Sequence, residues 1–261
     1  MTASLLSVIE DEDDEQEVCR RVSELVDQGW DVNAADDFGT TPLHSACRCN
    51  RPSVAELLIS RGARLLDTDR DGVAALYLAA HGGFPDIVRL LLRSGLNDCS
   101  SLNLHCIEGC TAFYAACHQG HTDVAELLFR AGADPNLPDD QGNTPLMSAV
   151  VGGRTEVVGF LGSIGVDVSA ANNNSMTAVD MAYLTQRKHL LGQLIASSRG
   201  RPLPASSYRV CMNGGCSSTE GLRSCETCKS VFYCSSDCQQ RDMRLHRQHC
   251  TSVQQEGGGL D

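Results

Sequence analysis

Paired cysteines near the C-terminus are the residues of this sequence best suited to chemistry. Seven cysteines and one histidine form four pairs, with two to four residues inside each pair and five to eight residues between pairs. The eight candidate ligands are Cys211, Cys216, Cys225, Cys228, Cys234, Cys238, His246 and Cys250. Thiolate sulfur and imidazole nitrogen are common zinc ligands, and eight of them suffice for two tetrahedral ions. The spacing therefore predicts two Zn²⁺ ions per chain, and it is compatible with either a sequential or an interleaved division of the ligands.

Other uses of these thiols fit the sequence less well. No charged N-terminal region followed by an apolar stretch marks a secretory signal, so we expect an intracellular location, in the cytoplasm, the nucleus or both. In such a reducing environment, clustered cysteines are more often metal ligands than disulfides. A redox centre would require a single Cys-x-x-Cys in a thioredoxin-like setting, which is absent. Residues 211–250 contain few large apolar side chains, so bound metal must supply their folding free energy.

The remaining cysteines and histidines show no comparable pattern. Seven cysteines lie scattered between residues 19 and 117, where we interpret them as small apolar residues of helices. His105, Cys106 and Cys110 form a local group that suggests a metal, but no further ligand pair lies nearby. No histidine belongs to a Cys-His or Ser-His-Asp constellation, so we expect no catalytic residue and no enzyme.

The elements before this cluster follow a repeat. Segments such as GTTPLHSA, which begins at Gly39, and GNTPLMSA, which begins at Gly142, recur at steps of 33, 37, 33 and 33 residues. A second marker, a glycine after an apolar stretch, recurs from Gly29 to Gly165 at steps of 33, 33, 37 and 33 residues. Because two independent markers share one period and one four-residue insertion, the chain is predicted to stack similar units.

Each unit predicts two short helices. Thr41 and Pro42 are residues that cap and open a helix, and apolar residues follow at helical spacing. A second apolar helix is predicted over residues 54–59, and Gly62 ends it in a left-handed conformation. One helix pair is too small to bury its own apolar face, so the copies must stack. The predicted fold class is mostly α: a helical solenoid followed by a small finger that binds two zinc ions.

This unit resembles the ankyrin repeat, whose signature includes T-P-L-H. The resemblance covers residues 17–198, with partial copies at 17–35 and 173–197 acting as caps. Four full copies begin near Asp37, Arg70, Ile107 and Asp140.

The copies differ at informative positions. The histidine of the signature is His44 in the first copy and a tyrosine or methionine in the next three, which indicates a structural hydrogen-bonding role. The second copy has Ala74 in place of the capping threonine, a loss of about 1 kcal/mol. The four extra residues fall between Gly95 and Gly109, in a finger-like loop. We interpret them as a tolerated loop insertion, and a local binding feature is the alternative.

Composition sets the other boundaries. Residues 1–16 are predicted to be an acidic, solvated segment, 199–210 a linker rich in Ser, Pro and Gly, and 251–261 a disordered tail. Residues 1–198 carry 13 Lys and Arg against 27 Asp and Glu. This acidic majority argues against a nucleic-acid partner, and no apolar run is long enough for membrane insertion.

Residues 211–250 resemble the MYND-type zinc finger, through C-x2-C, F-Y-C-S-x2-C-Q and H-x3-C. The resemblance implies interleaved ligation. One ion would be held by Cys211, Cys216, Cys234 and Cys238, and the other by Cys225, Cys228, His246 and Cys250. The first pair is wider than the family's usual Cys-x2-Cys.

The resemblance also implies a peptide site. Family members that bind proline-rich peptides use a tryptophan and a nearby glutamine. Here Gln239 is present, but Met243 stands at the tryptophan position.

The two resemblances together predict a non-catalytic adaptor, which binds one protein through the repeats and another through the finger. Two alternatives remain: a nuclear transcriptional co-regulator that recruits proline-rich corepressor peptides, and a substrate-recruiting subunit of a ligase or methyltransferase complex.

Overall fold

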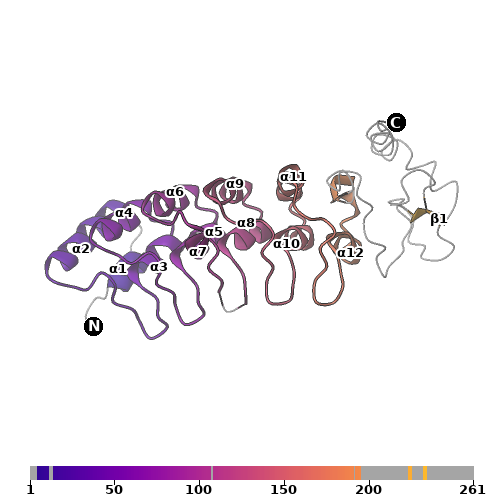
Figure 1. Ribbon diagram of the computed structural model, residues 1–261. Coiled ribbons are helices and arrows are strands. Elements are labelled where there is room, and N and C mark those ends of the chain that lie inside the picture. The colour runs from indigo at the N-terminus through magenta and orange to yellow at the C-terminus, as the bar shows by residue number, and fades with distance from the viewer. Residues whose placement is uncertain are drawn as a thin grey trace, which may run out of the picture. The chain divides into compact units, whose positions relative to one another are not determined.

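A computed structural model of the chain describes residues 5–11, 14–106, 108–190 and 192–194, and the strand residues 223–224 and 232–233 (Figure 1). The chain divides into two compact units, residues 1–140 and 141–261. Its elements are α1 (Leu5–Asp11), α2 (Glu15–Asp27), α3 (Pro42–Arg48), α4 (Pro52–Ser60), α5 (Ala75–Gly82), α6 (Pro85–Arg93), α7 (Cys99–Leu102), α8 (Ala112–Gln119), α9 (Thr122–Ala131), α10 (Pro145–Gly152), α11 (Thr155–Ile164), α12 (Ala178–Leu184), the 3₁₀ helix η1 (Lys188–Leu190), β1 (Arg223–Ser224) and β2 (Phe232–Tyr233).

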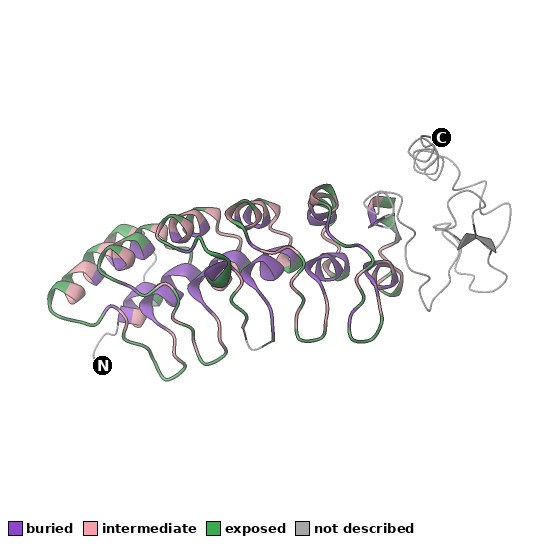
Figure 2. Ribbon diagram, in the orientation of Figure 1, coloured by how far each residue is buried: buried purple, intermediate pink, exposed green. Residues whose placement is uncertain are grey.

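Helix pairs stack in the first unit. One row contains α1, α3, α5 and α8, and the other contains α2, α4, α6 and α9. Each helix contacts its neighbours in its own row and its partner in the other (Figure 1). The α3 and α8 helices are buried along most of their length and α5 along half of it, whereas the other row and the connecting loops carry more exposed residues (Figure 2). The predicted stack of helix pairs is therefore confirmed.

The second unit repeats this pairing. Its α10 helix packs against α11 and α12, and α12 contacts η1. The strands β1 and β2 pair antiparallel, with Arg223 opposite Tyr233 and Ser224 opposite Phe232.

The predicted helix ends are also confirmed. The Oγ1 atom of Thr41 accepts a hydrogen bond from the backbone N of His44 at 3.4 Å, so the first turn of α3 is capped. Ala74 occupies the equivalent position before α5 and makes no side-chain cap. The second helix of this copy is one or two residues longer at each end than predicted, and Gly62 follows it at φ +89°.

Long loops connect each pair to the next, and we call them fingers: finger 1 (residues 30–41), finger 2 (63–74) and finger 3 (96–111) (Figure 1). A carboxylate closes the tip of finger 1, where the Oδ1 atom of Asp36 accepts from the backbone N atoms of Phe38 and Thr40, both at 2.8 Å. Asp69 does the same in finger 2, at 2.9 Å. Cys106 takes this position in finger 3.

The N-terminal segment differs from the prediction of a solvated stretch over residues 1–16. The α1 helix buries Leu5, Val8 and Ile9, which are at most 3% exposed. The carboxylate of Glu10 accepts from the hydroxyl of Ser45 at 2.6 Å and pairs with an arginine of α3. The acidic run obscured an i, i+3, i+4 apolar pattern just before it, so the capping copy begins at Leu5 rather than at residue 17.

The insertion in finger 3 is predicted to be a loop, but the structure has a helix there. Its residues enter a short helix, α7, whose N-cap Asp98 accepts from the backbone N of Ser101 at 2.9 Å. Leu102 at the end of α7 is 1% exposed. The insertion therefore adds an apolar contact to the stack.

Candidate interaction site

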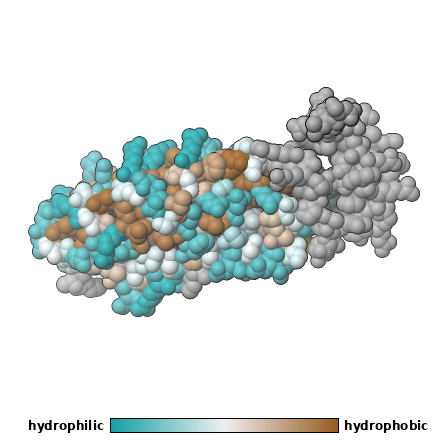
Figure 3. Space-filling model, in the orientation of Figure 1, coloured by the Kyte–Doolittle hydropathy of each residue, from teal (hydrophilic) through white to brown (hydrophobic). Residues whose placement is uncertain are grey.

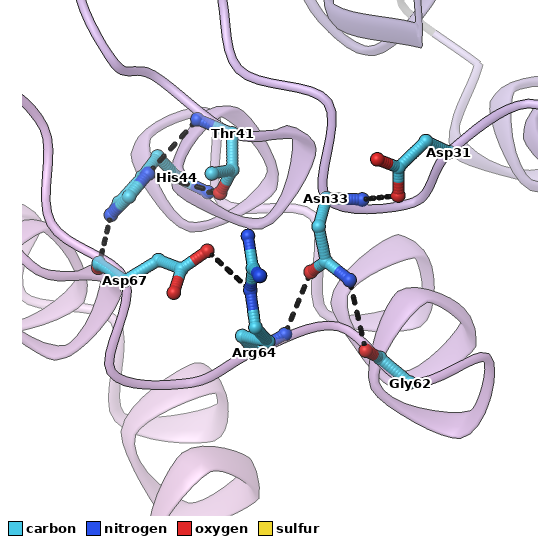
Figure 4. Close-up of polar contacts among 7 residues, drawn as sticks. All are labelled: Asp31, Asn33, Thr41, His44, Gly62, Arg64 and Asp67. Atoms are coloured by element: carbon cyan, nitrogen blue, oxygen red, sulfur yellow. Dashed lines mark hydrogen bonds and ion pairs between the residues drawn. The ribbon is translucent and has the colours of Figure 1, made fainter.

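The histidine of the first full copy joins two neighbouring repeats (Figure 4). The Nδ1 atom of His44 accepts from the backbone N of Thr41 at 3.0 Å, and its Nε2 atom lies 3.0 Å from the backbone O of Asp67. Because a carbonyl oxygen only accepts, Nε2 carries the proton. Burial lowers the pKa of His44, although the nearby aspartates raise it in part. The predicted structural role is confirmed, and the neutral ring is suited to it.

An asparagine makes a second link between the same fingers (Figure 4). The Nδ2 atom of Asn33 donates to the backbone O of Gly62 at 3.2 Å, and its Oδ1 atom accepts from the backbone N of Arg64 at 2.9 Å. Asn103 of finger 3 is its equivalent and accepts from the backbone N of Asp134 at 3.0 Å. These amides fix each finger against the next one.

Finger 2 lacks this amide. Leu66 occupies the position that belongs to Asn33 in finger 1 and Asn103 in finger 3. A leucine side chain has no donor or acceptor, so it cannot make the same link to the following finger. Leu66 is 54% exposed, and the exposure of its apolar side chain to water is unfavourable.

An apolar pocket lies where finger 2 meets finger 3. It is partly open and shallow, with a cavity volume of about 10 Å³. Its apolar wall includes Leu65, Leu66, Tyr77, Leu96, Leu102 and Leu104. Ala74, the missing threonine cap, and Cys106, the missing tip aspartate, also line it. The departures of the second and third copies from the repeat pattern thus meet at one place.

The phenol that lines the pocket stays uncharged at neutral pH. Burial raises the pKa of Tyr77 to about 12, and the negative charge of Glu108 acts in the same direction. Most of the remaining lining is aliphatic, so the pocket is suited to apolar contact.

The other cysteines and histidines of the repeats have structural positions. Cys47 and Cys117 are fully buried in α3 and α8, as predicted, and burial raises the pKa of both thiols. The Nε2 atom of His121 lies 3.1 Å from the backbone O of His81, next to the turns that join helices. The described part of the chain contains no group of three or more His, Cys, Asp or Glu that would bind a metal ion.

The predicted zinc ligands lie outside the described residues, as do Gln239 and Met243. The short hairpin of β1 and β2 falls within this segment of the sequence. Residues 225–231 connect its strands and include Cys225 and Cys228, while Cys234 directly follows β2. The donor set of seven thiols and one imidazole fits zinc.

Hydrophilic and hydrophobic residues both reach the visible surface (Figure 3). Hydrophilic residues cover most of the visible face of the first unit, with a band of hydrophobic residues between them (Figure 3). Within the described residues, no helix combines the length and the apolar character that crossing a membrane requires.

The stacked helix pairs, the fingers and the recurring helix caps define a protein built of helical repeats. Comparison with known families supports this class. The model for ankyrin repeats (3 copies) matches residues 14–103 and 76–172, which is more than half of the sequence. The chain belongs to the ankyrin-repeat family. A second model, for the MYND finger, matches residues 209–250. Both predicted resemblances are confirmed, and the chain therefore combines repeats with a zinc-binding finger.

Curated relatives share parts of this chain. The mouse B-cell lymphoma 3 protein homolog is 30% identical over 153 residues, which are 58% of this chain and 34% of that protein. The zebrafish putative palmitoyltransferase ZDHHC13 is 26% identical over 238 residues, or 74% of this chain and 36% of that protein. The Arabidopsis histone-lysine N-methyltransferase ASHR1 is 35% identical over 75 residues, or 28% and 15%. The chain spans about a third or less of the length of these relatives.

The roles of two pocket residues were not recognised from the sequence. Leu66 is unremarkable as a single residue, and Cys106 was noted only as part of the group with His105 and Cys110 that suggested a metal. Aligning the copies position by position shows both as departures, at the sites of Asn33 and Asp36. That comparison was the signal available in the sequence.

Proposed function

We propose that the protein is a non-catalytic adaptor, which holds one protein partner on its repeats and a second on its finger. The observation that carries the proposal is the presence of two interaction modules, ankyrin repeats and a MYND finger, in one chain. Two linked modules raise the effective affinity for an assembly that displays both targets. The partners are proteins rather than nucleic acids, because the repeats are acidic. The proposed location is the cytoplasm, the nucleus or both.

The finger binds two zinc ions in this proposal. One ion is held by Cys211, Cys216, Cys234 and Cys238, and the other by Cys225, Cys228, His246 and Cys250. The donor chemistry and the hairpin of β1 and β2 support this assignment. Zinc here supplies folding free energy to a segment that has few large apolar side chains. Gln239 and Met243 would form the floor of a peptide groove.

One alternative role has support from the comparisons. Relatives of this chain include the methyltransferase ASHR1 and the Arabidopsis E3 ubiquitin-protein ligase KEG, which is 34% identical over 120 residues, 7% of that protein. In this role the repeats and the finger would bring substrates to such an enzyme. The other alternative, a nuclear co-regulator, requires that the finger bind proline-rich corepressor peptides.

Affinity capture with matched variants tests the adaptor. The wild-type chain, a Cys225→Ser variant and a Leu66→Asn variant would each be used as bait, and the bound proteins identified by mass spectrometry. An adaptor should lose one set of partners through the finger substitution and retain those of the repeats. Failure of the wild-type chain to bind any protein above a tag-only control would overturn the proposal. Recovery of ligase or methyltransferase subunits would select the recruiting role.

A further inference from the structure

The pocket between fingers 2 and 3 carries an inference about what the repeats bind. We propose that it is the docking site for an extended, basic segment of a partner protein, which packs one apolar side chain against Leu66 and Leu104. This inference rests on the proposed adaptor function and specifies the partner's chemistry at the repeats. It uses features that the other described fingers lack, namely the α7 insertion and a leucine in the asparagine position.

The pocket is built by departures from the repeat. In finger 1, Asn33 uses its amide to join the neighbouring finger. The same position in finger 2 is Leu66, whose side chain lines the pocket instead. The insertion then places α7 against the stack, where Leu102 forms the buried floor. Two changes, one substitution and one insertion, thus replace a polar link with an apolar opening.

Two leucines at the opening are exposed, so an apolar group that covered them would be bound favourably. Leu66 is 54% exposed and Leu104 is 37% exposed, and both line the pocket. A single apolar side chain placed against them would remove some of this apolar surface from water. The cavity volume of about 10 Å³ is far below the roughly 300 Å³ at which small-molecule sites begin, so the opening suits packing of one side chain against its wall rather than a cofactor.

The surrounding charge selects a basic partner. Fingers 2 and 3 and residues 133–140 together carry eight Asp and Glu against two Lys and Arg. No ion pair is found for Asp71 or Glu108 among the residues that the structure describes, and both are exposed. The basic residues are Arg64, which pairs with Asp67 at 2.8 Å, and Arg70. A basic segment would be attracted and oriented by this field.

The same charge disfavours other occupants. An acidic peptide would meet like charge on both sides of the pocket. A second copy of this chain carries a net charge of −12, so its approach is opposed as well. An extended segment is favoured over a helix because it can place one side chain in the pocket while its flanking residues reach finger 2 on one side and finger 3 on the other.

Peptide titration of the full zinc-loaded chain tests the proposal. The probes are three fluorescein-labelled peptides, KRKLKRK, KRKSKRK and EDELEDE, followed by fluorescence anisotropy at two salt concentrations. The wild-type chain should bind the leucine peptide about ten-fold more tightly than the serine peptide, and the acidic peptide weakest. Raising the salt should weaken binding of both basic peptides.

Variants locate the binding. Leu66→Asn introduces the residue that finger 1 already has at this position, and Leu104→Ser shortens the opposite wall. Each should lower affinity for the leucine peptide about ten-fold and leave the serine peptide unchanged. Leu184→Asn is the matched control, because Leu184 is 55% exposed but lies in α12, and it should change neither affinity. Thermal unfolding of each variant separates lost binding from lost folding.

Several results would overturn the proposal. Equal binding of the two basic peptides would show a general attraction of charge without a pocket. Tighter binding of the acidic peptide would refute the charge argument, and self-association that Leu66→Asn abolishes would show that a second copy fills the pocket. In affinity capture, full retention of every repeat-bound partner by Leu66→Asn would refute the pocket while leaving the adaptor function intact. A wild-type chain without any partner would refute the adaptor itself.

Discussion

The imidazole of His44 links the capping residue Thr41 to the backbone O of Asp67 in the next repeat, with both contacts at 3.0 Å. Replacing His44 with alanine removes both hydrogen bonds and leaves a partly buried carbonyl without its donor. We expect the free energy of unfolding to fall by about 1–3 kcal/mol, measured by urea denaturation. A variant as stable as the wild type would contradict the role of this side chain.

This histidine should also make stability depend on pH. Burial holds its pKa below the ordinary value of 6.5, so the unfolded chain takes up a proton first as the pH falls. The contribution of His44 is then fully present above pH 6.5 and decreases as the pH falls through the lowered pKa. His44→Tyr, which introduces the residue of the second and third copies, should remove this component. The test compares the urea midpoints of both proteins between pH 7.5 and 5. As the pH falls, the wild-type midpoint should decrease relative to that of His44→Tyr.

Restoring the missing cap should stabilise the second copy. Thr41 caps α3 and Thr144 caps α10, but Ala74 leaves the first turn of α5 without a side-chain acceptor. Ala74→Thr should raise the free energy of unfolding by about 1 kcal/mol, and Thr144→Ala should lower it by a similar amount. Thermal unfolding of the two variants tests both expected changes in stability. If both substitutions destabilise, Ala74 serves the shape of the pocket more than the helix.

Repeat alignment explains what the sequence made predictable and what it did not. Caps such as Thr41 and left-handed glycines such as Gly62 recur with the period, so the helices could be predicted from local chemistry. The position of α1 was missed because Leu5 and Val8 precede an acidic run that suggested solvent. Leu66 was missed because its role arises only from a contact between two fingers, which no local pattern encodes.

The glycine at the tip of the third finger has a steric requirement that recurs with the period, since Gly39 and Gly142 approach the backbone of the next finger in the same way. A methyl group on Gly109 would lie 2.7 Å from the backbone N of Asp140, and the residue has φ +74°. Gly62 has a similar φ of +89° but nothing within 4 Å of such a methyl group. We expect Gly109→Ala to lower the free energy of unfolding by about 3 kcal/mol and Gly62→Ala by about 1 kcal/mol. Equal losses in chemical denaturation would mean that the backbone of Asp140 gives way easily.

The zinc assignment predicts both a count and a pattern. Elemental analysis of the purified chain should give about two zinc ions, because eight donors fill two tetrahedra. Replacing Cys225 and Cys228 with serine should leave an ion with four thiolates if ligation is interleaved. It should leave three thiolates and one imidazole if ligation is sequential. Absorption spectra of the cobalt-substituted variant distinguish these ligand sets.

The same variant tests whether the finger folds separately. Its far-ultraviolet circular dichroism should keep the helical signal of the repeats, because few contacts are expected across the proposed linker at 199–210. Cys99→Ser is the control, since Cys99 is an exposed thiol of α7 and should bind no zinc. Loss of the whole helical signal would contradict independent folding, and loss of zinc from the control would contradict the assignment.

The peptide groove of the finger can be tested by restoring the family's aromatic residue. Proline-rich segments are already extended, so they lose little conformational entropy when they dock. A flat ring at position 243 would add apolar contact and stacking against proline, worth about 1 kcal/mol or roughly five-fold in affinity. Met243→Trp should therefore bind a P-x-L-x-P peptide more tightly than the wild-type chain in calorimetric titration with zinc present. The paired Gln239→Ala variant should bind it more weakly, because the groove would lose a polar contact. If the tryptophan weakens binding instead, Met243 shapes a groove different from the family's, and if no form binds, the finger meets its partner through another surface.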